Sequence, residues 1–596
     1  LSLSENQAKN IKIQTKQLKT ESAKVIADQQ LDLTATQNID NQKGQYGANQ
    51  INIDTNHLNN DQGLIQHTGQ NDFILNIADR IDNKTGKIIS NANNTEIKTN
   101  SLNSNAGEIL HAGNQQLKIT AQSLQGQQGT IQSNSKLQLE LGATNLDNAT
   151  TTAQNINLNV TSLSHQQGQL IQSDANGQLN VNVEQVLDNT SGVISAAGHA
   201  KIKTADLNNQ QGVIQSLAQK DLIIDSKTVE NASGKIIVGR DANLHVSQLN
   251  NDTGTVYADG KLDLQAEQNV SNQQGLIAAK QALSIKGQAL NNQKGQIQSE
   301  QSDVSVNLTK TINNQSGHIQ SAQALNIYSP NLNNNNGQLI SGADSQLNVT
   351  ELNNQAGTIY SKKQLDVNVS ATADNSVGTI AAEQNLNLNA QQLLNDAGQI
   401  RSQQDQLKLN VENELSNLAG EISANKAIEL TANTLSNQNG KVIAGTSLHA
   451  TTQQIDNTTG TIYAKDQLNL NVADQLNNQS GTIAANQQVQ IQAKNLNNNA
   501  GKIRSEQNLL DLNVQQTLDN QSGEIFAGTH AKVNTTTLNN QQGTIYAKNQ
   551  IDLTAGQLNN QQGQVYSEGS ANVTVQGNVQ NQNGVIVAGQ SLAVQS

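Results

Sequence analysis

One short motif recurs along the whole chain and limits what the chain can fold into. LNNQQG begins at Leu207, Leu538 and Leu558, and close variants such as LNNDTG and LNNQSG occur between these copies. Aligned on the last residue of the motif, 28 copies lie between residues 23 and 584, a mean spacing of 20.8 residues (561/27). A fixed period of this length is typical of solenoids, in which each repeat stacks on the next.

The spacing of the copies divides the chain. Glycine ends 26 of the 28 copies, and we assign Ala23 and Thr151 to this position in the other two. From Gly275 the spacings 20, 22, 20, 20 and 21 occur three times, which gives a super-repeat of five units and 103 residues. Before Gly192 the spacing varies between 17 and 24. We therefore expect diverged, irregular repeats over residues 1–192 and regular repeats over 193–596, with the super-repeat from about residue 275.

Apolar and polar residues alternate inside each unit. The unit that starts at Gly543 reads GTIYAKNQIDLTAGQLNN. Its alternation predicts short β-strands with one buried face, and no segment has the three-and-four spacing of an amphipathic helix. The residues expected to face inward are Ile545, Ala547, Ile551, Leu553, Ala555 and Leu558.

A unit of this size cannot bury its apolar face alone, but it can bury that face against an identical unit. If each unit forms one full coil, equivalent strands pair in parallel and in register at about 4.8 Å. The predicted fold class is therefore all-β: a right-handed parallel β-helix, or solenoid, of about 28 coils of roughly 20 residues. At that spacing the coils would extend over about 130 Å.

The motif residues have predicted roles at one corner of the coil. We expect the recurring glycine to take a positive φ, which costs little without a Cβ. We expect the Asn residues to stack in consecutive coils and to donate and accept amide hydrogen bonds along the stack. On this interpretation, Gly440→Val strains one corner by about 1–2 kcal/mol.

Composition argues against several other classes of protein. Only 2% of the 596 residues are aromatic and 34% are apolar, which leaves too few large side chains for ordinary globular domains. Cysteine is absent, so disulfides and thiolate-bound zinc are excluded. The net charge of −13 is spread thinly without a basic block, so we expect no nucleic-acid partner. No apolar run approaches the roughly 18 residues of a membrane span, and we expect any export signal outside this segment.

No cluster of residues indicates catalysis, a metal or a cofactor. The histidines lack HExxH or comparable ligand spacing, and we expect all nine to be solvated. A β-helical polysaccharide lyase or hydrolase is the remote enzymatic alternative, but its site needs convergent carboxylates, usually framed by long loops. Unit lengths vary too little in the regular region to supply such loops. The histidines are His57, His67, His111, His165, His199, His245, His318, His449 and His530.

Five tyrosines are candidate surface contacts. Four of them are spaced 103 residues apart, and each of these four follows an inward Ile or Val, so the alternation turns it outward. Exposed aromatic rings suit carbohydrate or protein ligands, but inheritance through duplication explains the spacing equally well. The 22-residue units pose a similar choice between a tolerated surface bulge and a ligand-contacting ridge. The candidates are Tyr257, Tyr360, Tyr463, Tyr546 and Tyr566.

The repeat LNNQxGxI-x-A/S, followed by L-x-L, resembles the haemagglutinin repeats of filamentous haemagglutinin-like, two-partner-secreted exoproteins of Gram-negative bacteria. These include large adhesins and contact-dependent growth inhibition exoproteins. The similarity extends from about Leu18 to the end of the sequence. It implies a right-handed β-helical shaft on the cell surface, secretion through an outer-membrane partner, and receptor-binding or toxin modules elsewhere in the chain.

The sequence therefore predicts a non-catalytic structural shaft of a secreted or cell-surface exoprotein, outside the outer membrane. The expected partners are an outer-membrane secretion partner, through a region not seen here, and a target-cell receptor or host surface, through other modules. No nucleic acid, membrane span or cofactor is expected. Two alternatives stay open: the rod surface itself binds glycan or matrix, or the shaft belongs to a toxin-delivering growth-inhibition exoprotein.

Overall fold

The computed structural model describes residues 1–217 and 219–596. These residues form strands from β1 (Glu5–Lys19) to β61 (Ser591–Gln595), and they contain no helix. The chain divides into two compact units, Leu1–Gln301 and Ser302–Ser596. Within each unit the equivalent strands pair in parallel, which confirms the all-β class and the parallel β-helix.

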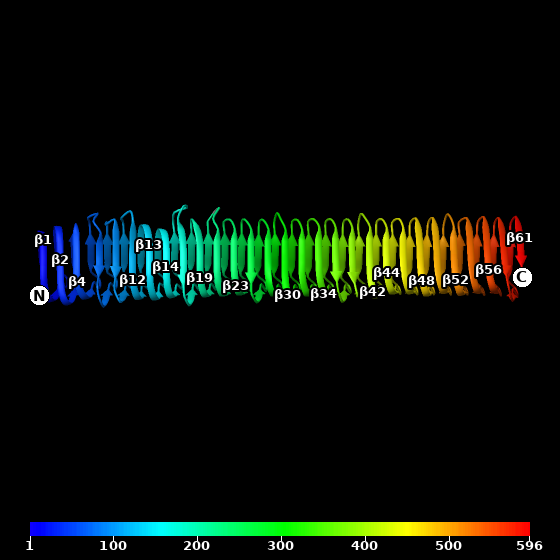
Figure 1. Ribbon diagram of the computed structural model, residues 1–596, viewed down its shortest axis with the longest axis horizontal. Helices are drawn as coiled ribbons and strands as arrows, with labels where there is room; N and C mark the ends of the chain where they lie inside the picture. The colour runs from blue at the N-terminus through cyan, green and yellow to red at the C-terminus, as the bar shows by residue number, and fades with distance from the viewer. Residues whose placement is uncertain (218) are drawn as a thin grey trace. The chain divides into compact units, whose positions relative to one another are not determined.

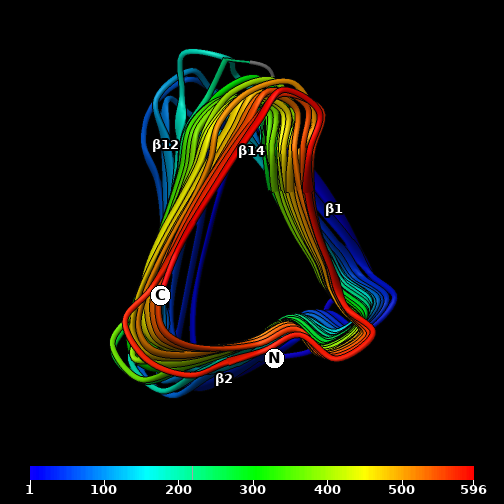
Figure 2. The same cartoon turned by 90° about the vertical axis from the view of Figure 1, so that its right-hand side faces the viewer.

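Each coil has up to three strand segments. One coil of the second unit consists of β38 (Thr379–Ala382), β39 (Leu386–Ala390) and β40 (Gln392–Leu394). In many coils the second and third segments join into one strand, as in β44 (Ile428–Ser436). Within each unit, equivalent strands of successive coils lie next to one another (Figure 1), and single coils seen end on trace a triangular path (Figure 2).

Equivalent strands stack residue on residue. Ile380 pairs with Ile400 of β41 (Gln399–Ser402), and Leu386 pairs with Leu407, the first residue of β42 (Leu407–Ser416). This register places like residues in columns that run from coil to coil. It is the arrangement that the fixed period predicts.

The core is mostly aliphatic, and in the first unit it also contains the buried rings of Tyr46 and Phe73. The six residues predicted to face inward after Gly543 are at most 1% exposed, which confirms the alternation. The fourth residue after the corner glycine also points inward, and we call this position the small-residue column. In the second unit it is Ala or Ser in every coil, from Ser321 to Ala588.

The third residue before the corner glycine forms a buried asparagine ladder. Nδ2 of Asn437 donates to Oδ1 of Asn457 at 2.7 Å and lies 3.3 Å from the carbonyl oxygens of Gly440 and Thr461. These bonds confirm the predicted stacking, and each adds about 0.5–1.5 kcal/mol net. In the second unit the ladder residues, all buried except the last, are Asn314, Asn334, Asn354, Asn375, Asn395, Asn417, Asn437, Asn457, Asn478, Asn498, Asn520, Asn540, Asn560 and the exposed Asn581.

The predicted positive φ of the corner glycine is wrong. No described glycine has a positive φ; the residue before the corner glycine does, as for Asn439 at 55°. Glycine is needed for a different reason, because a Cβ on Gly440 would lie 2.1 Å from the carbonyl oxygen of Asn417 in the preceding coil. A bare Cα therefore lets consecutive corners approach closely.

The register also corrects one repeat assignment. Thr130 pairs with Thr150, so Ala149 lies in register with Gly129. The assignment of Thr151 to the glycine position is therefore wrong. The motif is too degenerate in this copy for the period alone to place it, whereas the strand pairing fixes it.

The 22-residue coil that ends at Gly420 is longer than most coils, and a register shift in its second strand takes up an extra residue. The pairing of β42 with β44 shifts between Val411 and Glu414, where β42 has one more residue than its partner. Such a shift is a β-bulge, which bends a strand without ending it.

The expectation that all nine histidines are solvated is wrong for three of them. His67, His111 and His165 are at most 2% exposed. The first two stand in the small-residue column, and His165 takes the place of a ladder asparagine. In Figure 2 the backbone paths of the blue and cyan coils spread further from one another than those of the yellow and red coils do.

A matched pair of alanine substitutions tests the corner geometry. Gly440→Ala should destabilise its corner by about 2–3 kcal/mol, because the new Cβ collides with the backbone of the preceding coil. Asn439→Ala should cost much less, since alanine already occupies this positive-φ position at Ala419 and Ala500. Hydrogen exchange at the corners around residues 417–461 measures both. Equal loss of protection in the two variants would contradict the clash.

Candidate surface contact site

The five predicted tyrosines all occupy the same outward position of their coils. We call this position the outer column; it is the third residue after each corner glycine, on the solvent face of the short first strand. Tyr360 pairs with Ala381, and Ala381 with Arg401. In the second unit the outer column contains Gln320, Ile340, Tyr360, Ala381, Arg401, Ser423, Ile443, Tyr463, Ala484, Arg504, Phe526, Tyr546, Tyr566 and Val587.

Tyr360, in β35 (Thr358–Ser361), leans across the next coil. Its hydroxyl donates to Oε1 of Glu383 at 2.6 Å, and Ala381 is only 1% exposed although it points outward. The ring therefore covers Ala381. Desolvation, together with the hydrogen bond to the Glu383 carboxylate, raises the pKa of Tyr360 to about 12.

Two other tyrosines repeat this arrangement. The hydroxyl of Tyr463, in β47 (Thr461–Ala464), donates to Oδ1 of Asn486 at 3.1 Å, and the outward Ala484 is 8% exposed. In the first unit Tyr257 pairs with Ala278, which is fully buried. Each of these tyrosines is half-buried, with an alanine beneath it and no aromatic neighbour in its column.

The last two tyrosines belong to a stack of rings. Phe526 stacks on Tyr546 with ring centroids 5.3 Å apart, and Tyr546 stacks on Tyr566 at 5.5 Å. The guanidinium of Arg504 lies 4.4 Å from the centroid of Phe526. Neighbours therefore cover the ring faces inside this stack, so it contributes to coil-to-coil packing.

The two arginines of the outer column differ in their surroundings. Arg504 forms ion pairs with Glu506, at 2.8 Å, and with Glu524. Arg401 is exposed and has no hydrogen bond or ion pair with any described residue. The surface around Tyr360 therefore offers an unpaired guanidinium two coils from the ring, whereas the charge near Tyr463 is neutralised.

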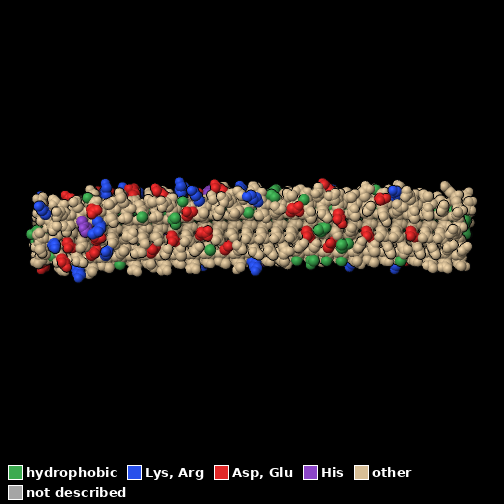
Figure 3. Space-filling view, turned by 90° about the horizontal axis from the view of Figure 1, so that it is seen from below, with side chains coloured by type: hydrophobic (Ala, Val, Ile, Leu, Met, Phe, Trp, Pro, Cys, Tyr) green, Lys and Arg blue, Asp and Glu red, His purple; other side chains and the backbone are tan. Residues whose placement is uncertain are grey.

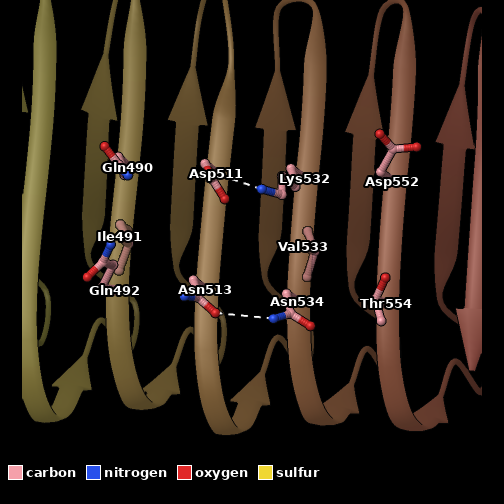
Figure 4. Close-up of a pocket in the computed structure, with 10 residues that line it drawn as sticks. All are labelled: Gln490, Ile491, Gln492, Asp511, Asn513, Lys532, Val533, Asn534, Asp552 and Thr554. Carbon is pink, nitrogen blue, oxygen red and sulfur yellow. Dashed lines mark hydrogen bonds and ion pairs between the residues drawn. The ribbon is translucent and has the colours of Figure 1, made fainter. Parts of the chain in front are cut away.

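A shallow groove of about 380 Å³ lies on a different face of the second unit, over the longer strands. Nζ of Lys532 lies 3.8 Å from the carboxylate of Asp511, and Asn534 donates to Asn513 at 3.2 Å (Figure 4). Asp552 accepts hydrogen bonds from three neighbouring side chains. All the charged groups that line the groove, those of Asp511, Lys532 and Asp552, therefore already have partners.

The described residues contain no group of three or more His, Asp or Glu placed to hold a metal ion. On the face shown in Figure 3, acidic and basic side chains are scattered among neutral polar ones. Among the described residues there is also no helix that could cross a membrane. The surface therefore combines amides and hydroxyls with scattered charged side chains and a few aromatic rings.

Comparison with known protein families shows which family has this type of repeat. The family model for the haemagglutinin repeat matches residues 6–84, 112–183, 172–228, 224–273, 257–316, 301–372, 362–419, 406–480, 464–522 and 527–583. The chain belongs to the haemagglutinin-repeat family. No curated protein and no solved structure gave a significant match. Haemagglutinin repeats on a β-solenoid fit an extended, adhesin-like shaft, and the family implies a secreted or cell-surface exoprotein.

Sequence reasoning on this haemagglutinin-repeat chain missed part of the outer column. Phe526 was not singled out, and the 103-residue spacing of Arg401 and Arg504 did not reveal their different partners. The signal was available for Phe526, because it stands three residues after Gly523, the position that the tyrosines share. The pairing of Arg504 with acidic groups depends on side-chain geometry between coils, which the period does not contain.

Titration of Tyr360 tests its position across the neighbouring coil. Glu383→Gln should lower the pKa of Tyr360 from about 12 part of the way toward the ordinary value near 10, because the carboxylate that holds the phenol proton is removed. Ultraviolet difference absorbance, with Tyr360→Phe to assign the signal, measures this shift. Glu429→Gln, on another face of the unit, should leave it unchanged. An unshifted Tyr360 in Glu383→Gln would contradict the contact.

Proposed function

We propose that this chain is a non-catalytic structural shaft of a secreted or cell-surface exoprotein. It extends and presents adhesive or toxin-delivery modules to a target cell or surface. Passage through an outer-membrane secretion partner, and a final location outside the outer membrane, belong to the same proposal. A target-cell receptor or host surface would then be contacted by modules outside these repeats.

One observation carries the proposal: the register continues from coil to coil through each unit, with a buried hydrogen bond in nearly every step of the second. Each strand pairs with its equivalents before and after it, and the asparagine ladder adds a 2.7 Å bond between successive corners. A coil held on both sides cannot tilt without breaking several bonds at once. Stiffness along the stack is the property that a spacer needs.

Removal of one complete super-repeat tests the shaft. Deleting residues 379–481 removes 103 residues (481 − 378) and joins Gly378 to Thr482, which restores the sequence GTIAA found at both sites. The remaining coils should stack in register, and the second unit should shorten by about 24 Å at 4.8 Å per coil. Small-angle scattering measures the maximum dimension.

A deletion out of phase provides the control. Removing residues 379–471 takes out a fractional number of coils, so inward and outward residues no longer match across the junction. This variant should lose cooperative unfolding, whereas the in-phase deletion keeps it. A compact scattering profile for the intact chain, or no shortening in the in-phase variant, would overturn the shaft.

A second candidate function is glycan or matrix binding by the surface of the shaft itself. The isolated tyrosines favour it, because Tyr360 and Tyr463 lie over alanines and leave part of each ring open to solvent. A free aromatic face beside polar side chains suits the apolar face of a sugar ring. The stacked Tyr546 lacks this property, because its ring lies between two others.

Alanine substitutions separate this second function from the shaft alone. If the surface binds glycan, Tyr360→Ala with Tyr463→Ala should reduce binding of the chain to immobilised glycans or cell surfaces at least tenfold. Tyr546→Ala, which removes a ring of the same size from the stack, should reduce it little. Absence of binding by the unmodified chain, or equal loss in both variants, would leave the passive shaft as the function.

A further inference from the structure

The first unit buries three histidines, whereas the second buries none among its described residues. His67, His111 and His165 are at most 2% exposed. In the second unit His318 and His449 are exposed and His530 is half-buried. A buried imidazole is neutral in the folded chain unless a carboxylate or several hydrogen bonds compensate its charge.

His67 has little such compensation. Neither ring nitrogen makes a well-formed hydrogen bond, although the backbone of Gly69 lies near the ring. The imidazole stacks on the ring of Phe73, with centroids 4.9 Å apart. Its strand β5 (Leu64–His67) packs between β3 (Gln45–Ala48) and β8 (Lys87–Ser90). The titratable group that faces inward there is the phenol of Tyr46, and the charged Lys87 is exposed and pairs with Glu108.

His111 is held by neutral groups. Its Nε2 lies 3.0 Å from the carbonyl oxygen of Ala92, and its Nδ1 lies 2.9 Å from the hydroxyl of Ser133. The strands that flank it, β8 and β13 (Thr130–Asn145), place Ser90 and Ser133 in register with it. No carboxylate pairs with this imidazole among the described residues.

His165 continues the ladder with one nitrogen. Its Nδ1 donates to Oδ1 of Asn189 at 2.8 Å, while Nε2 is buried without a well-formed hydrogen bond. The carboxylates on the neighbouring coils are those of Asp147 and Asp188, and both accept hydrogen bonds from Gln166 on the surface. Asp147 favours the charged imidazole through space, but the effect of burial is larger.

Burial sets the sign of the pH dependence. Desolvation lowers the pKa of each of the three histidines below its ordinary value near 6.5. The unfolded chain therefore binds protons more readily than the folded coils do. Stability is fully present above about pH 6.5 and falls as the pH drops toward the lowered pKa values of the folded state.

We propose that the coils between residues 44 and 192 form an acid-sensitive segment that opens when the buried histidines become charged, while the second unit stays folded. The other histidines of the first unit are less buried, and each lies beside a carboxylate: His57 beside Asp82, His199 beside Asp221 and His245 beside Asp225. Opening therefore depends on the buried set.

Hydrogen exchange of the full chain tests the proposal. After correction for intrinsic exchange rates, the protection factors of amides in coils 44–192 should fall at least tenfold between about pH 7.5 and about pH 5. A tenfold fall corresponds to a difference of about one pKa unit between the folded and unfolded states. Protection in the second unit should change much less. An equal change in both units would overturn the proposal.

The chain itself suggests the neutral replacements. Gln172 stands in the small-residue column, and asparagine is the usual ladder residue, so His67→Gln, His111→Gln and His165→Asn are matched to their columns. The triple variant should lose most of the acid sensitivity, and His449→Gln in the second unit should not. If the triple variant folds poorly, His165→Asn alone should still reduce the pH dependence. Unchanged acid sensitivity in both would refute the mechanism.

Discussion

The close contact between consecutive corners is the constraint on which the rest of the structure depends. The Cα of the corner glycine faces the carbonyl oxygen of the ladder residue in the preceding coil, with no room for a Cβ, as at Gly440 and Asn417. The same asparagine donates its amide to the next coil at 2.7 Å. Steric exclusion and a directional bond therefore act at one corner. Together they fix both the rise and the register of the coils.

Once the register is fixed, each remaining position of the coil forms a column of equivalent residues with its own chemistry. In the second unit the inward columns contain aliphatic residues, small residues or asparagine, because like residues pack on like residues through the unit. Outward columns can vary, but a charge stacked on a like charge at about 4.8 Å is repelled, so amides and hydroxyls dominate the surface. The scarcity of charge follows from this repulsion. A stacked repeat selects side chains that tolerate copies of themselves as neighbours.

The sequence was sufficient to predict the coil, the inward alternation and the asparagine ladder, because each depends only on residue identity at a fixed period. It did not predict the backbone at the corner, since a recurring glycine is equally consistent with a positive φ and with a close approach. The buried histidines show a different limit. His67 and His111 looked like isolated polar residues, yet each stands four residues after a corner glycine, where Ala and Ser are buried elsewhere. Alignment by column would have found them; side-chain partners such as Glu383 for Tyr360 needed coordinates.

The outer column shows how one repeated position can serve packing or leave a surface open. Where aromatic residues occupy successive coils, as from Phe526 to Tyr566, each ring covers the next and the column becomes part of the scaffold. Where an alanine follows, as after Tyr360, the ring lies on the sheet and keeps solvent on one side. The residue in the next coil therefore decides what a tyrosine can do. In a solenoid, duplication carries a site together with its neighbours, so single changes in the following coil can separate copies in function without disturbing the fold.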